Sequence, residues 1–474
     1  MSKRDHGSRT NGFILGMIYM FVFLFVGLSG YMVWFTWKEA PDLVNNSYNG
    51  RLAKLNEAVV RGDILSADGK VLATTEVGDD GEETRIYPFK NDFAHVVGYT
   101  SVGTSGLEAS AGYYLLNSHE AVLDRIYKEI TNQKEAGDTV VTTLNSELQE
   151  LISDAMEGYK GSCVVMDPTT GEILAMVSKD DFDPNTLADQ YADIVSDDDN
   201  SSLVNRATQG LYTPGSTFKL VTALAYIREN PDTWKDFSYN CEGSITEGNH
   251  TINCAHGNSH GVVDLETALA KSCNCAFVKM GLTLSIHDYR ETARDLMFNQ
   301  TINTDLRVAK SKFDLTGSSG RNLIMQTVFG QGNTKVTPLL NCMIVSAIAN
   351  KGVMMNPYLV SEVRSVDGRT VETLGGDSLG SVMTSKEASI LSDMMCAVVN
   401  KGTGTVLQSS DYQAAAKTGS AETGQDKNTD AWMVAFAPAD NPKIAVSIVL
   451  EEAGTGSGSG GPIIKKIFDA YLAD

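Results

Sequence analysis

A long apolar run near the N-terminus limits most strongly how this chain can fold. From Phe13 to Trp37 the sequence contains no charged residue. At about 1.5 Å per residue, a helix over this run is longer than the ~30 Å hydrocarbon core of a bilayer. We therefore expect a transmembrane helix over residues 13–37, with some tilt.

The residues on either side of this run indicate its orientation. Basic residues precede it and aromatic residues crowd its far end: Lys3, Arg4 and Arg9, then Tyr31, Trp34, Phe35 and Trp37. Because positive charge stays on the cytoplasmic side, we expect residues 1–12 to form a cytoplasmic tail and the chain after Lys38 to lie outside the cell. A cleaved signal peptide is the alternative, but the run is too long for one and no small-x-small cleavage site follows it.

Length and charge narrow the class of protein. The 474 residues allow two or three domains, and a hydrophobic content of 42% is ordinary for a folded chain. Lys and Arg total 38 against 59 Asp and Glu, which gives a net charge of −21. We therefore expect no nucleic-acid partner.

The cysteines leave three alternatives open. There are seven of them, an odd number: Cys163, Cys241, Cys254, Cys273, Cys275, Cys342 and Cys396. Cys241 and Cys254 bracket a predicted hairpin and could form a disulfide outside the cell. The same segment holds His250, His256 and His260, which admits a zinc site instead. The third alternative is free thiols, and we assign no metal ligand and no cofactor.

The segment after the anchor is a small, loop-rich domain. Residues 38–137 contain no long amphipathic helix before a predicted one at 118–130. Arg61 to Leu72 reads as two short strands joined by a turn at Asp68-Gly69. We interpret this part as a β-rich spacer or docking domain.

The pattern of elements from residue 138 to residue 474 predicts a second, larger domain. A strand over 139–143, a helix capped by Asn145 and a hairpin over 161–178 come first. The later predicted elements are helices from Ser216, at 264–271, 337–350 and 385–400, strands at 414–420, 431–437 and 443–450, and a closing helix at 463–471. This order predicts an α/β (α+β) domain with one antiparallel sheet and a helical insert.

Three short motifs carry candidate chemistry. Ser216 and Lys219 are three residues apart at the start of an apolar helix, so the hydroxyl and the amine share one face. Burial favours a neutral amine that can accept a proton, and this arrangement activates a serine nucleophile. Ser272 and Asn274 supply a second hydroxyl and a carboxamide.

The third motif runs from Lys417 to Ser420. Lys417 and Thr418 are candidates to bind a carboxylate, and Gly419 leaves room for a substrate against the strand. The backbone N–H groups of Ser216 and Ser420 are candidates to polarise a carbonyl.

The three motifs, in this order, resemble those of class B penicillin-binding proteins, which are monofunctional cell-wall transpeptidases. The match extends over nearly the whole chain, and Arg61-Gly62-Asp63-Ile64 resembles the signature that opens the family's pedestal domain. Further matching stretches are Asn205-Arg206-Ala207, Tyr212-x-Pro214, His260-Gly261, Gly330-Gln331-Gly332 and Val336 to Leu339. The chain is most similar to the compact, short-pedestal type called penicillin-binding protein A.

The resemblance implies a function and an architecture. A pedestal or dimerisation domain would occupy 38–137 and a transpeptidase domain 138–474. Ser216 would attack the D-Ala-D-Ala bond of a stem peptide or a β-lactam, with Lys219 as base and Ser272 as proton relay. Asn274, Lys417 and Thr418 would hold the substrate. No glycosyltransferase domain is visible, so the resemblance implies a membrane glycan polymerase as partner. A β-lactamase or penicillin sensor, or a non-catalytic scaffold for that polymerase, is the alternative.

Overall fold

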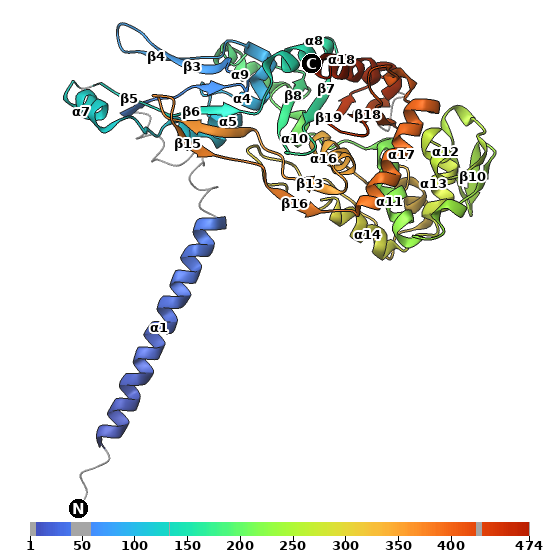
Figure 1. The fold of residues 1–474 in the computed structure, drawn as a ribbon, viewed down its shortest axis with the longest axis horizontal. Coiled ribbons are helices and arrows are strands. Elements are labelled where there is room, and N and C mark those ends of the chain that lie inside the picture. Colours follow the sequence, from blue (N-terminus) through green and yellow to red (C-terminus); the bar gives the residue numbers. More distant parts are fainter. Residues whose placement is uncertain (1–5, 39–57, 132, 423–428, 474) are drawn as a thin grey trace, which may run out of the picture.

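The computed structural model describes residues 6–38, 58–131, 133–422 and 429–473. Residues 1–5 of the expected cytoplasmic tail and residues 39–57 at the start of the expected pedestal lie outside these ranges. Helix α1 (His6–Lys38) stands apart from the rest of the chain (Figure 1). Its segment Gly12–Phe35, with a mean hydropathy of 2.2, is long and apolar enough to cross a membrane.

The chain after α1 folds into two parts, and the elements from residue 59 to residue 142 build the first of them. Its strands are β1 (Val59–Val60), β2 (Ile64–Leu65), β3 (Val71–Val77), β4 (Glu83–Ile86), β5 (Glu135–Ala136) and β6 (Thr139–Thr142). Its helices are η1 (Lys90–Phe93), α4 (Ala94–Val97), α5 (Gly106–Ser110), α6 (Gly112–Leu115) and α7 (Val122–Ile130). The predicted turn at Asp68-Gly69 joins β2 to β3, which pair antiparallel.

We call this part, which contains the expected pedestal, the small sheet domain. It is organised by a six-stranded sheet in the order β15-β14-β6-β2-β3-β4. Two of its strands, β14 (Val360–Arg364) and β15 (Thr370–Thr373), come from far along the chain. Strand β6 pairs parallel with β2 and antiparallel with β14. The boundary that we expected at residue 138 therefore runs through a sheet whose strands come from both sides of it.

The second sheet has five antiparallel strands in the order β17-β18-β19-β7-β8. Their bounds are β7 (Gly161–Met166), β8 (Ile173–Lys179), β17 (Ala415–Glu422), β18 (Thr429–Ala437) and β19 (Ile444–Leu450). Successive side chains of β18 enter opposite cores, with Trp432 and Val434 in one and Met433 and Ala435 in the other. Because both faces are covered, β7, β8 and β19 are almost continuous apolar runs.

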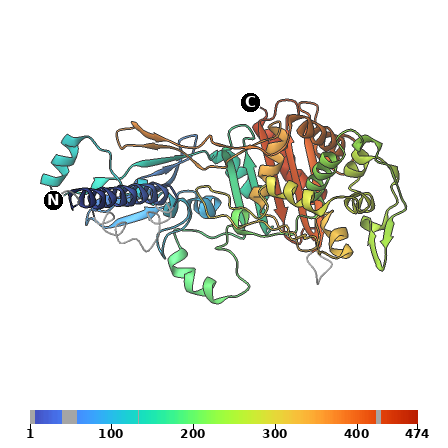
Figure 2. The ribbon, with the colours of Figure 1, turned by 90° about the horizontal axis from the view of Figure 1, so that it is seen from below.

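Helices cover both faces of this sheet (Figure 2). Helix α16 (Pro338–Ala349) packs on β7, β18 and β19, while α8 (Ser146–Ala155) and α18 (Gly461–Tyr471) pack on the other side. Asn145 caps α8 as predicted, since its side chain accepts a hydrogen bond from the Leu148 N–H.

A helical region is inserted between β8 and β17, as predicted. Its helices are α9 (Leu187–Ser196), α10 (Arg206–Gln209), η2 (Gly215–Phe218), α11 (Lys219–Glu229), η3 (Trp234–Asp236), η4 (Ala255–Gly257), α12 (Leu265–Ala270), α13 (Asn274–Gly281), α14 (Ile286–Asp295), α15 (Arg321–Thr327), α17 (Ser385–Lys401) and η5 (Thr405–Leu407). Its strands are β9 (Tyr239–Cys241), β10 (Ser244–Glu247), β11 (His250–Asn253), β12 (Gly261–Val263), β13 (Val353–Met355) and β16 (Ser378–Ser381). A π-helical turn, η6 (Gly456–Gly460), precedes α18.

Candidate active site

Ser216 lies in a 3-10 turn that leads into α11, not in the α-helix itself. The turn is fixed from two sides: the Gly215 N–H donates to Gly330 O (3.0 Å), and Trp432 Nε1 donates to Thr213 O (3.0 Å). Phe218, at the end of the turn, packs against the rings of Phe298 and Phe313 in an aromatic cluster of the helical region. The turn therefore holds the Ser216 hydroxyl at a fixed position, where it remains partly accessible.

The Lys219 amine lies at the centre of the cluster and is fully buried. Its Nζ lies 3.0 Å from Ser216 Oγ and 3.1 Å from Ser272 Oγ, and it donates to Ser272 O and Asn274 Oδ1 at 2.7 Å each. Burial lowers the pKa of Lys219 to about 7, because the charged form loses its hydration. The amine can therefore lose its proton near neutral pH.

Ser272 and Asn274 lie where α12 turns into α13. Ser272 has a positive φ of 54°, which non-glycine residues seldom adopt. Asn274 is the first residue of α13, and its Nδ2 donates to Asn253 O at 3.0 Å. The carboxamide is thereby oriented so that Oδ1 faces Lys219.

Lys417 extends from β17 into the same cluster and is also fully buried. Its Nζ donates to Ser272 Oγ (3.0 Å) and to Thr418 O (2.7 Å). Burial, and then the nearby Lys219, hold the pKa of Lys417 well below its usual range. We expected this side chain to bind a carboxylate, and the structure places its amine on Ser272.

Gly419 has neighbours within the protein that sequence reasoning missed. A Cβ atom there would lie 3.0 Å from the Trp432 Cβ and 3.2 Å from the Thr217 Cγ2. We expected its missing side chain to leave room for a substrate, and the close approach in the structure is between β17 and η2. Thr418 contacts Thr403 through their hydroxyls (2.6 Å), and Ser420 is partly accessible beside the η2 turn.

Glu451 also supports the site and was not singled out from the sequence. It forms an ion pair with Arg206 at 2.9 Å and accepts a hydrogen bond from Tyr212 OH at 2.6 Å. These contacts fix the segment that leads into the Ser216 turn. No sequence signal connects Glu451 with Arg206, because most of the helical region and the strands β17, β18 and β19 lie between them along the chain.

The cysteines are buried free thiols, so the Cys241–Cys254 disulfide is not formed. Their Sγ atoms lie 3.7 Å apart. Cys273 lies directly between Ser272 and Asn274, and its Sγ is 3.7 Å from the Cys254 Sγ. The thiol cluster is therefore adjacent to the candidate active site.

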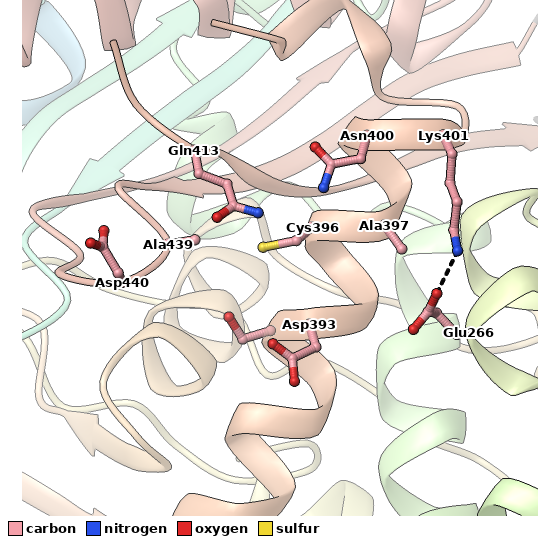
Figure 3. A pocket seen from close by; sticks show the side chains of 10 residues that line it. Glu266, Asp393, Cys396, Ala397, Asn400, Lys401, Gln413, Ala439 and Asp440 are labelled. Atoms are coloured by element: carbon pink, nitrogen blue, oxygen red, sulfur yellow. Dashed lines mark hydrogen bonds and ion pairs between the residues drawn. The ribbon is translucent and has the colours of Figure 1, made fainter. Parts of the chain in front are cut away.

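A separate pocket of about 440 Å³ lies between α12, α17 and the loops that flank the five-stranded sheet (Figure 3). Its lining includes Asp393, Cys396 and Gln413, and an ion pair between Lys401 and Glu266 (2.7 Å) borders it. None of the candidate site residues lines this pocket.

Comparison with known proteins agrees with this arrangement. The model of the penicillin-binding protein transpeptidase domain matches residues 161–469, and that of the penicillin-binding protein A dimerisation domain matches residues 61–140. The peptidoglycan D,D-transpeptidase PbpA of Mycolicibacterium smegmatis is 34% identical over 86% of this chain and 88% of its own length.

Solved structures give the same result. Penicillin-binding protein A from M. tuberculosis, as an imipenem acyl-enzyme complex, has a TM-score of 0.81 at 29% identity, covering 88% of this chain and 100% of that one. The D,D-transpeptidase domain of a peptidoglycan glycosyltransferase from Eggerthella lenta has a TM-score of 0.79 at 31% identity, covering 87% and 99%. This chain therefore belongs to the penicillin-binding protein transpeptidase family.

Proposed function

We propose that this chain is a membrane-anchored serine D,D-transpeptidase that cross-links peptidoglycan stem peptides through an acyl-enzyme on Ser216. The observation that carries the proposal is the position of the buried Lys219 amine, 3.0 Å from Ser216 Oγ, with no carboxylate among its hydrogen-bond partners in the described part of the chain. Family membership supports the reaction class, since relatives are D,D-transpeptidases and one is solved as an imipenem acyl-enzyme.

In the first half-reaction, Ser216 Oγ attacks the carbonyl carbon of the D-Ala-D-Ala bond while its proton passes to Lys219 Nζ. The backbone N–H groups of Ser216 and Ser420 are the proposed donors to the developing oxyanion. The proton then reaches the leaving amine by way of Ser272 Oγ, which lies within hydrogen-bond distance of both lysines. The terminal D-Ala departs, and the stem peptide remains as an ester on Ser216.

In the second half-reaction, the amine of a neighbouring stem peptide attacks the ester. The new peptide bond forms and Ser216 regains its proton through the same groups. Water in place of the amine would give carboxypeptidase activity. Asn274 is the proposed contact for the substrate amide. Thr418 and Lys417 are the proposed contacts for the terminal carboxylate.

The environment of the enzyme is part of the proposal. We propose that α1 anchors the chain in the cell membrane, with the N-terminus in the cytoplasm and the two sheets outside. A separate membrane glycan polymerase would supply the strands to be cross-linked, and α1 and the small sheet domain are the surfaces proposed to contact it. We expect no nucleic-acid partner.

Labelled penicillin tests the proposal with the full-length chain in detergent. We expect a lasting adduct on Ser216, located by mass spectrometry, and no adduct in Ser216→Ala. Rapid release of the label would point to a β-lactamase or sensor. If Ser216 is intact and no adduct forms, both enzyme interpretations are excluded and the non-catalytic scaffold is the remaining alternative.

A further inference from the structure

Four side chains of the types that bind metal ions lie close together next to Ser272 and Asn274. They are Cys241, Cys254, His260 and Cys273, whose donor atoms all lie within 4.8 Å of one another. Cys241 ends β9, Cys254 follows β11, and His260 precedes β12. Cys273 caps the N-terminus of α13. Loops from four places in the helical region therefore bring their donors to one point.

The distances between these donors fit a tetrahedral metal site. The Cys241 and Cys254 Sγ atoms are 3.7 Å apart, as are those of Cys254 and Cys273, and the Cys241 Sγ lies 3.5 Å from His260 Nδ1. A tetrahedral zinc ion with Zn–S bonds of about 2.3 Å and Zn–N bonds of about 2.0 Å has edges of about 3.8 Å and 3.5 Å. A disulfide would require sulfur atoms about 2.0 Å apart.

The backbone holds these donors in place. The Cys254 N–H donates to Gly243 O (2.8 Å), and Ser259 Oγ donates to Cys241 O (2.7 Å). A Cβ atom on Gly243 would lie 2.5 Å from Gly257 O, so the two loops can approach this closely only with glycine there. The three cysteines are buried, and His260 is partly accessible. The donor set is therefore assembled by the fold itself.

We propose that Cys241, Cys254, His260 and Cys273 bind one structural zinc ion. Three thiolates and one imidazole are a donor set that selects zinc, and four protein ligands close the site to substrate. Cys275 lies near the group, with its Sγ 3.4 Å from that of Cys254, but it is outside the set of four mutually close donors. It therefore provides a matched control.

The site would fix the geometry of Ser272 and Asn274, a consequence that rests on the proposed function. Cys273 separates these two residues, and Asn274 Nδ2 donates to the carbonyl of Asn253, the residue before Cys254. Zinc would thus hold Ser272 in its left-handed conformation from one side and orient Asn274 from the other. Removing the metal should slow the acylation of Ser216.

The test measures metal directly. The full-length chain, purified in detergent with a reductant, should contain close to one zinc per chain by elemental analysis. Zinc content should fall at least about tenfold in Cys273→Ser and His260→Ala, and it should stay near one in Cys275→Ser. Cobalt in place of zinc should show a thiolate-to-cobalt charge-transfer band that is lost in Cys273→Ser.

A second measurement avoids substitutions that could impair folding. A chelator should remove the zinc from the unmodified chain and lower its thermal unfolding midpoint, and zinc but not magnesium should restore the midpoint. A metal-free chain with intact thiols, or a Cys241–Cys254 disulfide in the purified chain, would overturn the proposal. Zinc retained by both ligand variants would do the same. Metal content does not depend on penicillin labelling, so either proposal can fail without the other.

Discussion

At the scale of single residues, the hydrogen bonds of Lys219 define the state in which it can act. Two of its neighbours, Ser272 O and Asn274 Oδ1, are carbonyl oxygens that can only accept. A neutral amine has two N–H groups for these acceptors and one lone pair left. That lone pair can accept the proton of the Ser216 hydroxyl, 3.0 Å away. The amine is thereby positioned as a general base once it is neutral.

The rate of Ser216 acylation should therefore increase as the pH rises through about 7, where Lys219 loses its proton. Lys219→Arg keeps the charge and cannot be neutralised, so we expect acylation to fall at least about 100-fold and the rise with pH to disappear. Time-resolved labelling with penicillin over a pH series measures both effects. Lys279→Arg, an exposed lysine on α13, is the control and should match the unmodified chain. An unchanged profile in Lys219→Arg would exclude Lys219 as the base.

Gly419 is a second residue whose surroundings give a prediction. A Cβ atom there would press on Thr217, the residue after the nucleophile, at 3.2 Å. We expect Gly419→Ala to slow acylation at least about tenfold by displacing the Ser216 turn, since small misplacements of reacting groups are costly. Gly317→Ala, at a position with no neighbour within 4 Å, should acylate normally. Equal rates for the two variants would contradict the packing argument.

At the scale of elements, one buried carboxylate joins the strands and helices of the small sheet domain. Glu108, on α5, is fully buried and forms ion pairs with Arg61 (2.5 Å) and Arg85 (2.7 Å). Arg85 also donates to Gly62 O at 2.8 Å. A Cβ atom on Gly62 would lie 2.0 Å from Asp138 O. In the pair Arg61-Gly62, the arginine therefore supplies a charge partner for Glu108, and the glycine allows the close approach of the Asp138 backbone.

Removing the charge of Glu108 should destabilise this domain. Glu108→Gln leaves two guanidinium groups with little exposure and no carboxylate, and we expect a loss of about 3–5 kcal/mol and a lower thermal unfolding midpoint. Glu266→Gln removes one partner of the exposed Lys401 ion pair and should cost less than about 1 kcal/mol. Differential scanning calorimetry of both variants compares them directly. If the two midpoints agree, Glu108 does not have this role.

At the scale of the whole molecule, the chain combines an exposed apolar helix with a body built on two sheets. Strand β14 returns from beyond α16 to pair with β6, and β15 pairs with β14, so the small sheet domain is completed by residues 360–373. The two parts of the body are therefore connected by more than one crossing of the chain.

The anchor gives the prediction at this scale. A chain without residues 1–38 should appear in the soluble fraction, while the full chain should remain in membranes after an alkaline wash, because α1 carries a span that is long and apolar enough to cross a membrane. Protease added to intact spheroplasts should digest the body and spare an epitope tag at the N-terminus. Digestion of the tag would show that the N-terminus lies outside the cell, opposite to the orientation that the basic residues indicate.

The sequence by itself determined the elements and the chemistry of the motifs. The apolar run, the cap at Asn145 and the apolar strands are local patterns, and helix and strand periodicity suffices to recognise them. The pair Ser216 and Lys219 is also local, because three residues along a helical turn bring two side chains together. Its resemblance to a known family then supplied the partners at Ser272, Asn274 and Lys417.

Only the tertiary structure decided which distant residues meet. Each of these contacts joins residues from different parts of the chain. They are the hydrogen bond from Lys417 to Ser272, the ion pair of Arg206 with Glu451, the close approach of Gly419 to Thr217, and the four donors around Cys254. Sequence periodicity fixes which face of an element is buried but does not say what lies opposite that face. Contacts across a core depend on how sheets and loops pack. The extent of a domain depends on the same packing, because strands from residues 360–373 complete the small sheet domain.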